Sequence, residues 1–475
     1  MNNLTIKKAK EGLLDNKFSS VDLTRACLLQ IKNTEGKLNA FVTVTDDKAL
    51  EQARKADQQI SHEPQATSYK PLLGIPIAIK DNFSTKGIRT TASSKVLDDY
   101  IPPFDATVVK KLKDAGAVIL GKTNMDAWAH GSSTETSDYG ATKNPWNTNY
   151  LPGGSSGGSA ASVAANQCIA AIGSETAGSI RQPSSWCGVV GLKPTYGRVS
   201  RYGVIAMGSS LDSPGPITKT VEDSALILEV LAGKDELDAT TSPKEILQYS
   251  KNLDKSVKDL KIGISSQYFI KGIDKEVEGS IKAAIKKFES LGAKIEEIKL
   301  FEPKYAIDVY TIIQRSEVSS NLARYDGIRY GFDRTKFQEE AKRRIMFGTY
   351  ALSSGYYDQY YNNAQRVRTV IIKDFEKAFE KVDIIIAPTS PSLALPVGST
   401  KDVSMFGEIA DVLVEPSSIA GLCGINIPVG FSKSHLPIGM QIIGPQFSEQ
   451  LVLSVAHQYE LNTQNESWRK REPGL

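Results

Sequence analysis

The chain has 475 residues, of which 40% are hydrophobic and 23% are charged, a composition typical of a folded globular protein and not of a disordered one. Its 57 basic and 54 acidic residues leave a formal net charge of +3, which is too small to indicate nucleic-acid binding through a broad basic face. The sequence has no secretory signal, no apolar run long enough to span a membrane, and no CxxC pair among its four scattered cysteines. We therefore expect a soluble, cytoplasmic protein without a membrane segment, a disulfide framework or a structural zinc site.

The first segment, to about residue 57, has the pattern of helices. Ser19–Asp22 is a plausible helix start with a capping sequence, and apolar residues follow it at helical spacing. From about Pro71 the pattern changes to short apolar runs that alternate with helical segments. We expect strands at 75–79, 117–120 and 168–172, and helices at 107–115 and 158–165. This alternation predicts an α/β fold.

A highly charged stretch, 233–260, is typical of a surface connection. It is followed by a helical, aromatic-rich section from about 305 to 381 and by further strand candidates. These candidates are 261–265, 294–300, 382–387, 424–429 and 440–443. Two separate folds would need a cleaner linker than 233–260, so we predict one elaborated domain.

The most unusual segment is Pro152–Ser159, PGGSSGGS, whose glycines allow tight turns and close approach of a ligand. It is not a P-loop, because Ser159 stands where the lysine must be. Hydrolase nucleophile elbows match it twice, centred on Ser155 and Ser156, but no strand precedes it and only His435 and His457 follow as possible bases. A flexible linker is the remaining alternative.

A second segment, GSETAGSIRQP at 173–183, follows a predicted strand directly. The backbone N–H groups of Thr176, Ala177, Gly178 and Ser179 can converge there on one anion, as an oxyanion hole requires. A serine at the end of such a turn is placed to attack a carbonyl carbon whose oxygen the same turn stabilises. By itself the segment is suggestive only.

The third segment, GIPIAIKDN at 74–82, places Lys80 at the end of an apolar strand. One interpretation is a strand-end charge that reaches solvent. The other is a buried lysine, because burial disfavours the ammonium and lowers the pKa toward neutrality. A lysine tuned in this way can act as a general base toward a serine.

Taken together, the three segments resemble the amidase signature family, whose Ser–cis-Ser–Lys triad lies in such motifs, and the resemblance extends from about residue 19 to 458. By position, it implies that Ser179 is the nucleophile, that Lys80 is the base and that Ser155 is a bridging serine next to a cis peptide. It also implies a single large domain with a mixed central β-sheet covered by helices on both faces, and hydrolysis without a metal or another cofactor. We divide this domain into an N-terminal helical part (1–66), a catalytic core (67–231), the charged connection (232–260) and a second α/β part (261–475).

Within the family the sequence is similar to the glutamine-hydrolysing subunits of tRNA-dependent amidotransferases. The similar stretches are Gly121–Asp126, Gly131–Ser137, Val190–Gly203, Ser319–Gly331 and Lys342–Tyr350. This resemblance implies that the chain releases ammonia from glutamine. It implies a heterotrimer in which a B subunit uses ATP with Mg to amidate misacylated Glu-tRNA(Gln) or Asp-tRNA(Asn), while a small C subunit holds the two together. The tRNA would contact the partner subunit.

The same resemblance implies a pocket for a free amino acid. Arg344 matches the position that holds the substrate carboxylate, Asp411 the position that pairs with the α-ammonium, and Tyr310 a wall residue with a hydroxyl. The alternatives are a solvated helix charge for Arg344 and a helix-cap or surface carboxylate for Asp411. Three features depart from the pattern: Ala177 stands where a second glycine is usual, His130 replaces a residue that is usually apolar, and the stretch between Tyr330 and Lys342 is shorter than usual.

Three other functions stay open. A stand-alone amidase of the same family would act on another carboxamide without partner subunits. A histidine-dependent hydrolase would need His435 or His457 for activity. A non-enzymatic scaffold would leave the glycine settings of Lys80, Ser155 and Ser179 unexplained.

Overall fold

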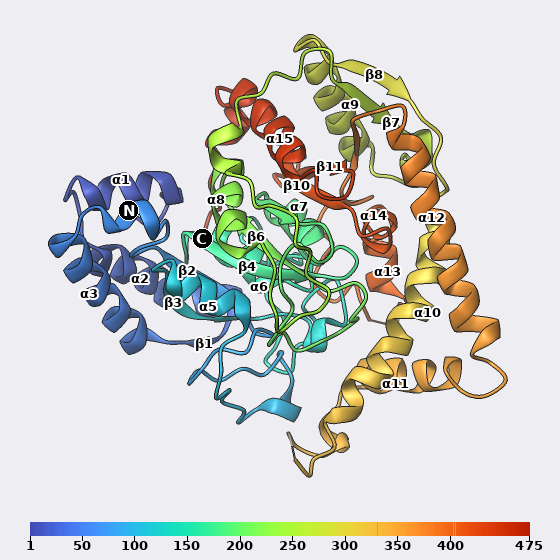
Figure 1. Cartoon of the computed structure of the whole chain (residues 1–475), viewed down its shortest axis with the longest axis horizontal. Coiled ribbons are helices and arrows are strands. Elements are labelled where there is room, and N and C mark those ends of the chain that lie inside the picture. The colour runs from blue at the N-terminus through green and yellow to red at the C-terminus, as the bar shows by residue number, and fades with distance from the viewer. Residues whose placement is uncertain (330, 402, 404) are drawn as a thin grey trace.

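A computed structural model describes residues 1–329, 331–401, 403 and 405–475 (Figure 1). Within this part of the chain the strands are β1 (Phe41–Val44), β2 (Pro76–Lys80), β3 (Val118–Thr123), β4 (Ala170–Glu175), β5 (Val190–Lys193), β6 (Ser213–Thr218), β7 (Lys261–Ile264), β8 (Lys294–Glu297), β9 (Ile384–Pro388), β10 (Cys423–Phe431) and β11 (Pro437–Gly444). The helices are α1 (Ile6–Leu14), α2 (Ser20–Leu38), α3 (Asp46–His62), α4 (Ala66–Tyr69), α5 (Thr107–Asp114), α6 (Gly157–Ala164), α7 (Arg181–Cys187), α8 (Val221–Leu231), α9 (Lys275–Ser290), α10 (Lys304–Asn321), α11 (Glu339–Ala351), α12 (Asn363–Phe379), α13 (Phe406–Ala410), α14 (Glu415–Ile419) and α15 (Glu449–Thr463).

These strands form one 11-stranded sheet in the order β1-β3-β2-β4-β6-β5-β10-β11-β9-β7-β8. The sheet is mixed: β2 pairs parallel with β3 and β4, whereas β4–β6 and β10–β11 are antiparallel. Strand β5, from the first half of the chain, pairs with β10 from the second half. The sheet is therefore continuous across the charged connection, which confirms the prediction of a single α/β domain.

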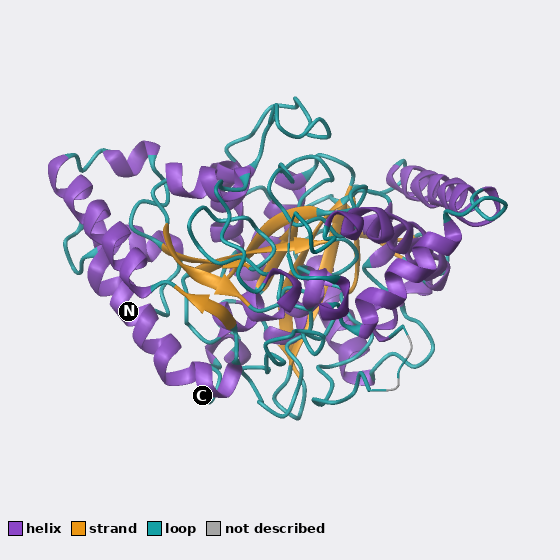
Figure 2. Cartoon of the chain, turned by 90° about the horizontal axis from the view of Figure 1, so that it is seen from below, coloured by secondary structure: helices purple, strands orange, loops and turns teal. Residues whose placement is uncertain are grey.

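Helices cover both faces of this sheet (Figure 2). A Cβ added to Gly439 of β11 would meet Ser185 of α7, whereas one added to Gly444 would meet Val452 of α15. Because these glycines are an odd number of positions apart in one strand, α7 and α15 lie on opposite faces. The predicted fold class, a mixed sheet covered on both sides, is confirmed.

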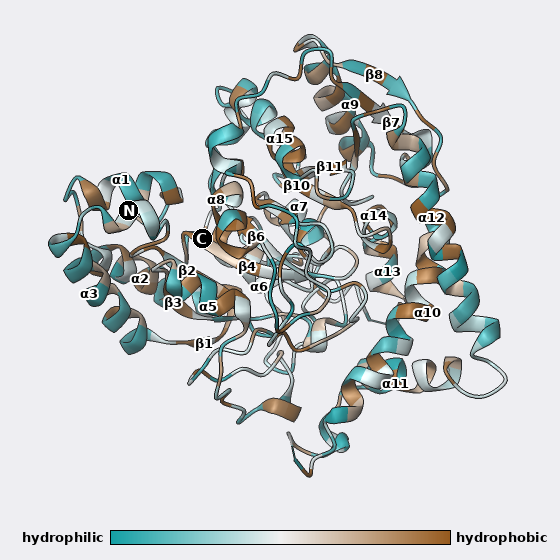
Figure 3. Ribbon diagram, viewed as in Figure 1, coloured by the Kyte–Doolittle hydropathy of each residue, from teal (hydrophilic) through white to brown (hydrophobic). Residues whose placement is uncertain are grey.

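The helices pack through one apolar face each, which Figure 3 shows as alternating polar and apolar ribbon along α9, α12 and α15. In α9 the buried residues Val277, Ile281, Ala284 and Phe288 follow the three- and four-residue spacing of a helix. The predicted start of α2 is confirmed, because Ser19 and Asp22 form a reciprocal capping box. No helix among the described residues is long and apolar enough to cross a membrane.

Several element predictions were wrong. The N-terminal segment is not wholly helical, because β1 lies between α2 and α3. Strands β5 and β6 were not predicted, since β6 reads SPGPIT and prolines ordinarily argue against a central strand. Strand β8 ends at Glu297, short of the expected residue 300. Strand β4 runs from Ala170 to Glu175, so the turn that follows it begins later than the sequence suggested.

Candidate active site

Lys80 is the last residue of β2, a strand whose 5 residues are all buried. Its Nζ donates hydrogen bonds to Oγ of Ser155 at 2.7 Å and to Oγ and O of Ser174 at 3.0 and 3.1 Å. The side chain has no exposed surface, so the interpretation of Lys80 as a strand-end charge in solvent is wrong. The strand delivers an amine into the interior of the protein, where it faces hydroxyl groups.

Burial lowers the pKa of Lys80 from 10.5 to about 7, because an ammonium is costly to remove from water. The carboxylates of Asp126, Asp212 and Glu175 act in the opposite direction and keep the pKa from falling further. A large fraction of Lys80 is therefore a neutral amine near pH 7. Such an amine can accept a proton, which is the chemical requirement for a general base.

Ser155 follows a cis peptide bond, Gly154–Ser155, in the glycine-rich segment that leads into α6. The next residue, Ser156, donates its N–H to the backbone O of Ser179 at 3.1 Å and its hydroxyl to the O of Ser174 at 3.2 Å. The segment that carries Ser155 thus lies against the segment that carries Ser179. The hydroxyl of Ser179 itself makes no hydrogen bond to the residues that the structure describes.

The loop between β4 and α7 leaves four successive N–H groups available. Of the hydrogen bonds between described residues outside helices and strands, none has the N–H of Thr176, Ala177, Gly178 or Ser179 as donor. Four successive unused donors beside a serine are suited to a developing oxyanion. Ala177 is not among the residues with positive φ, so its methyl group causes no backbone strain of the left-handed kind.

Glu175 and Arg181 hold the two ends of this loop. The Glu175 carboxylate accepts the N–H groups of Ile180 and Arg181 at 3.0 Å each, and it forms a fully buried ion pair of 2.6 Å with the Arg181 guanidinium. Arg181 also donates to Ser417 and Gln441, which belong to the second half of the chain. Sequence reasoning missed this anchor. An acid and a base six residues apart in an otherwise uncharged stretch were the available signal.

Two of the predicted substrate residues reach the loop from distant segments. The hydroxyl of Tyr310, on α10, lies 3.0 Å from Oγ1 of Thr176. Asp411 follows α13 and is buried, and a Cβ built on Gly178 would lie 2.4 Å from its Oδ1. Its Oδ2 accepts a hydrogen bond from Ser132 at 2.7 Å, whereas Oδ1 has no partner among the described residues. The alternative of a surface carboxylate is wrong for Asp411.

Burial raises the pKa of Asp411 well above its usual range, and the hydrogen bond from Ser132 opposes that rise. No cation of the described residues pairs with this carboxylate. A buried carboxylate with one free oxygen is stabilised when a ligand supplies a positive charge and an N–H donor.

Arg344 lies on α11 and is buried, so the alternative of a solvated helix charge is also wrong. Its Nε donates to Glu340 at 2.6 Å, its Nη1 to Gln314 at 2.8 Å, and its Nη2 lies 3.5 Å from Glu408. Burial alone would lower the pKa of Arg344, but the carboxylates of Glu408 and Glu340 raise it above its ordinary value. Glu408 in turn pairs with Arg315 at 3.1 Å.

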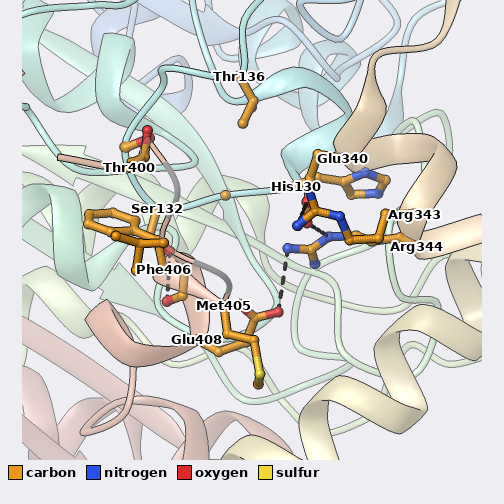
Figure 4. A pocket seen from close by; sticks show the side chains of 14 residues that line it. His130, Ser132, Thr136, Glu340, Arg343, Arg344, Thr400, Met405, Phe406 and Glu408 are labelled. Atoms are coloured by element: carbon orange, nitrogen blue, oxygen red, sulfur yellow. Dashed lines mark hydrogen bonds and ion pairs between the residues drawn. The ribbon is translucent and has the colours of Figure 1, made fainter. Parts of the chain in front are cut away.

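Arg344 lines a cavity of about 370 Å³ together with His130, Ser132 and Glu408 (Figure 4). The remaining described residues of the lining are Gly131, Ser133, Thr136, Glu340, Arg343, Thr400, Val403, Met405, Phe406 and Gly407. The lining carries the basic groups of Arg343 and Arg344 and the carboxylates of Glu340 and Glu408. Asp411 is not itself on the lining, but it is connected to it through its hydrogen bond from Ser132. Lys80, Ser155, Ser179 and Tyr310 are likewise not among the lining residues.

The histidines that a histidine-dependent hydrolase would need lie elsewhere. The ring nitrogens of His457, on α15, lie 3.6 and 3.8 Å from carboxylate oxygens of Asp254 and Glu460. His435 contacts Arg471. Neither histidine is hydrogen-bonded to Ser155 or Ser156. No group of three or more histidine, cysteine or acidic side chains within the described ranges is arranged to hold a metal ion.

Comparisons with known proteins show the family and the fold of the chain. A family model described as Amidase matches residues 22–453. The chain is 51% identical over 489 residues to the A subunit of the glutamyl-tRNA(Gln) amidotransferase of Carboxydothermus hydrogenoformans, with 99% of each chain covered. Among solved structures it is similar to the A subunit of the glutamyl-tRNA(Gln) amidotransferase of Thermotoga maritima, with a TM-score of 0.83 and 39% identity over 99% of this chain and 98% of that one. It is also similar to a peptide amidase from Stenotrophomonas maltophilia, with a TM-score of 0.85 and 28% identity over 99% and 98% of the two chains.

Proposed function

The chain belongs to the amidase family, and from that premise we propose that it is the glutamine-hydrolysing A subunit of a glutamyl-tRNA(Gln) amidotransferase. Full-length identity of 51% to a protein of that name supports the assignment. The structural observation that carries the chemistry is the buried Lys80, which is bonded to Ser155 beside the loop of Ser179.

In the proposed reaction Ser179 is the nucleophile. Its Oγ forms a bond to the carboxamide carbon of glutamine, and its proton passes to Ser155, whose own proton passes to the neutral amine of Lys80. The carbonyl oxygen becomes an oxyanion that the N–H groups of Thr176, Ala177, Gly178 and Ser179 stabilise. Collapse of this intermediate breaks the C–N bond, and the proton returns along the same path to the departing ammonia. A water molecule then hydrolyses the resulting ester and releases glutamate.

Recognition of glutamine rests on the charged walls of the site. Arg344 binds the α-carboxylate, Asp411 accepts N–H bonds from the α-ammonium, and Tyr310 forms a wall beside Thr176. The free Oδ1 of Asp411 and the position of Arg344 on the cavity support these roles. Because both groups are buried, each ionic contact is made away from water and is correspondingly strong.

The ammonia is used by partner subunits. A B subunit uses ATP and Mg to activate misacylated Glu-tRNA(Gln) or Asp-tRNA(Asn) and then amidates it, and a small C subunit holds the heterotrimer together. The small net charge of +3 supports the assignment of tRNA binding to a partner and not to this chain. Glutamine hydrolysis itself uses no cofactor in this proposal.

A stand-alone amidase is the second candidate. It is favoured by one observation, which is that the guanidinium of Arg344 already contacts two carboxylates of its own chain, Glu340 and Glu408. These contacts reduce the positive charge offered to a substrate carboxylate. Such an enzyme would act on an uncharged carboxamide without partner subunits.

One experiment separates the two candidates. The full chain is purified alone and together with its co-expressed neighbours, and ammonia release is measured with glutamine and with butanamide. The proposed function predicts a preference for glutamine and, with partners, ATP and Glu-tRNA(Gln), formation of Gln-tRNA(Gln). A preference for butanamide without any gain from partners would establish the stand-alone amidase instead.

A further inference from the structure

His130 is a buried side chain that has no hydrogen-bonding partner in the part of the protein that the structure describes. It is 2% exposed, and neither Nδ1 nor Nε2 has a partner among the described residues. An imidazole removed from water without replacement hydrogen bonds is destabilising, and a ligand that supplies them removes that cost. The ring also lines the cavity that contains Arg344 (Figure 4). It is therefore an unsatisfied polar group on a wall of this cavity.

The segment around His130 is fixed on both sides. The His130 N–H donates to O of Ala127 at 2.9 Å, and Asp126 accepts bonds from the N–H of Ser133 at 3.0 Å and the hydroxyl of Thr136 at 2.9 Å. Trp128, two residues before the histidine, packs against Tyr325 and Phe337 with ring centroids 4.9 and 5.3 Å apart. A segment held in this way keeps its side chain at the cavity and does not release it to solvent.

Burial and the charges around the ring favour its neutral form. Burial, and then the guanidinium groups of Arg344 and Arg315, hold the pKa of His130 well below its usual range. Glu408, the carboxylate that faces this region, is paired with both arginines. A neutral imidazole carries one N–H donor and one lone pair. His130 therefore adds a donor to the basic wall without adding a charge.

The donors of Arg344 are only partly used. A guanidinium has five N–H groups, and the contacts to Glu340, Gln314 and Glu408 involve three of them. Arg344 and His130 line the same cavity. Ser132, which donates to Asp411, belongs to the same lining. The arrangement fits an anionic group on the wall of Arg344 and His130 and a cationic group toward Asp411.

We propose that His130 is a specificity-determining residue that donates a hydrogen bond to the α-carboxylate of the substrate beside Arg344. This inference rests on the proposed function and names a further contact of the same site. It separates amino-acid amides from simple amides, because a carboxamide without a carboxylate makes no use of the imidazole.

The test compares His130→Leu, which removes both ring nitrogens, with His130→Gln, which keeps a donor. Ammonia release by the full chain is measured with glutamine and with butanamide, and folding is monitored by thermal unfolding and by labelling of Ser179 with a small sulfonyl fluoride. We expect His130→Leu to raise KM for glutamine about tenfold, as loss of one hydrogen bond to a charged group predicts, with kcat nearly unchanged. His130→Gln recovers part of this loss, and hydrolysis of butanamide is unaffected in both variants.

His457→Leu is the matched control, because it removes a histidine on α15 that is not part of the cavity lining. Hydrolysis of glutamine and of butanamide should be the same in this variant as in the original chain. An unaltered KM for glutamine in His130→Leu, or an equal loss with butanamide, would overturn the role of His130. If the unmodified chain does not hydrolyse glutamine with or without its partners, the proposed function fails and this inference fails with it.

Discussion

Nζ of Lys80 lies 2.7 Å from Oγ of Ser155, although the two residues are 75 positions apart in the chain. The contact joins the end of β2 to the glycine-rich segment before α6, and Ser156 ties that segment to the backbone of Ser179. The end of β2, the glycine-rich segment and the loop that carries Ser179 thus adjoin one another in the interior of the protein.

If Lys80 and Ser179 act as one catalytic unit, the losses of activity caused by replacing each of them do not add. Ser179→Ala is expected to remove glutamine hydrolysis almost wholly, because no acyl-enzyme can form, and Lys80→Ala is expected to do nearly as much. The double variant should be no worse than Ser179→Ala. Steady-state ammonia release, with chain integrity confirmed by thermal unfolding, measures this. More than about a tenth of the original activity in either single variant would contradict a unit of this kind.

The pH dependence follows from Lys80. It must be neutral to accept a proton, and its pKa is lowered to about 7. We therefore expect kcat/KM to fall about tenfold per pH unit below pH 7 and to level off above it. Butanamide suits this measurement because it carries no titratable group. A rate independent of pH from 5 to 8 would assign the base to another group.

Lys80 also makes the fold less stable than a neutral side chain would. The unfolded chain keeps the lysine proton up to about pH 10.5 and the folded chain only up to about 7, so the unfolded state binds more protons between these values and stability rises with pH across that window. Below pH 7 the folded chain carries the full free-energy cost of burying the Lys80 ammonium. Lys80→Met should therefore raise the free energy of unfolding by about 2–4 kcal/mol near pH 6, and by less near pH 10. Urea unfolding at the two pH values measures the difference, and an equal effect at both would contradict it.

Gly178 is the glycine that the geometry of the loop requires. A Cβ there would lie 2.4 Å from Oδ1 of Asp411 and 2.5 Å from Cγ2 of Val414. Gly178→Ala should shift the loop by a fraction of an ångström and reduce kcat/KM for glutamine by roughly 100-fold. Gly279→Ala, on α9, is the matched control, because a Cβ there has no neighbour within 4 Å. It should leave activity intact and stabilise the helix by about 0.5–1 kcal/mol.

Arg344 is the group whose removal should distinguish substrate binding from chemistry. Arg344→Ala is expected to raise KM for glutamine strongly, by loss of a desolvated charge-assisted pair worth about 2–5 kcal/mol. Labelling of Ser179 by a small sulfonyl fluoride should be unchanged, since that reagent needs no carboxylate contact. Arg344→Lys keeps the charge but not the paired donors, so its KM for glutamine should lie between those of the original chain and of Arg344→Ala. Equal loss of labelling and of glutamine turnover would mean that Arg344 maintains the fold instead.

The three segments that carry the predicted reactive groups could be found in the sequence, because each is short and has its own pattern; the roles of their side chains stay predictions. Lys80 ends an apolar run, Ser155 lies between glycines, and Ser179 closes a turn after a strand. The structure places these segments side by side. The structure also shows that Arg344 and Asp411 are buried. Their neighbours in the sequence could not predict this, because they include both charged and apolar residues.

The partners of these residues could not be predicted. Ser132 reaches Asp411 across 279 positions and Arg344 reaches Glu408 across 64, and no periodicity records a contact between such distant polar residues. Strand β6 was missed for a related reason: its prolines and glycine give it no strand propensity, and only the ladders with β4 and β5 make it a strand. Tertiary contacts decide both cases.

The buried guanidinium of Arg181 has a consequence for how the protein is made. Its partners include Ser417, Ser418 and Gln441, all synthesised more than 230 residues after it. A growing chain on the ribosome therefore presents Ser179 long before the groups that fix the adjoining loop exist. Until the last strands have emerged, the nascent polypeptide has a serine but no organised donors around it. If Ser179 is the nucleophile, we expect hydrolytic competence to begin only when synthesis is nearly complete.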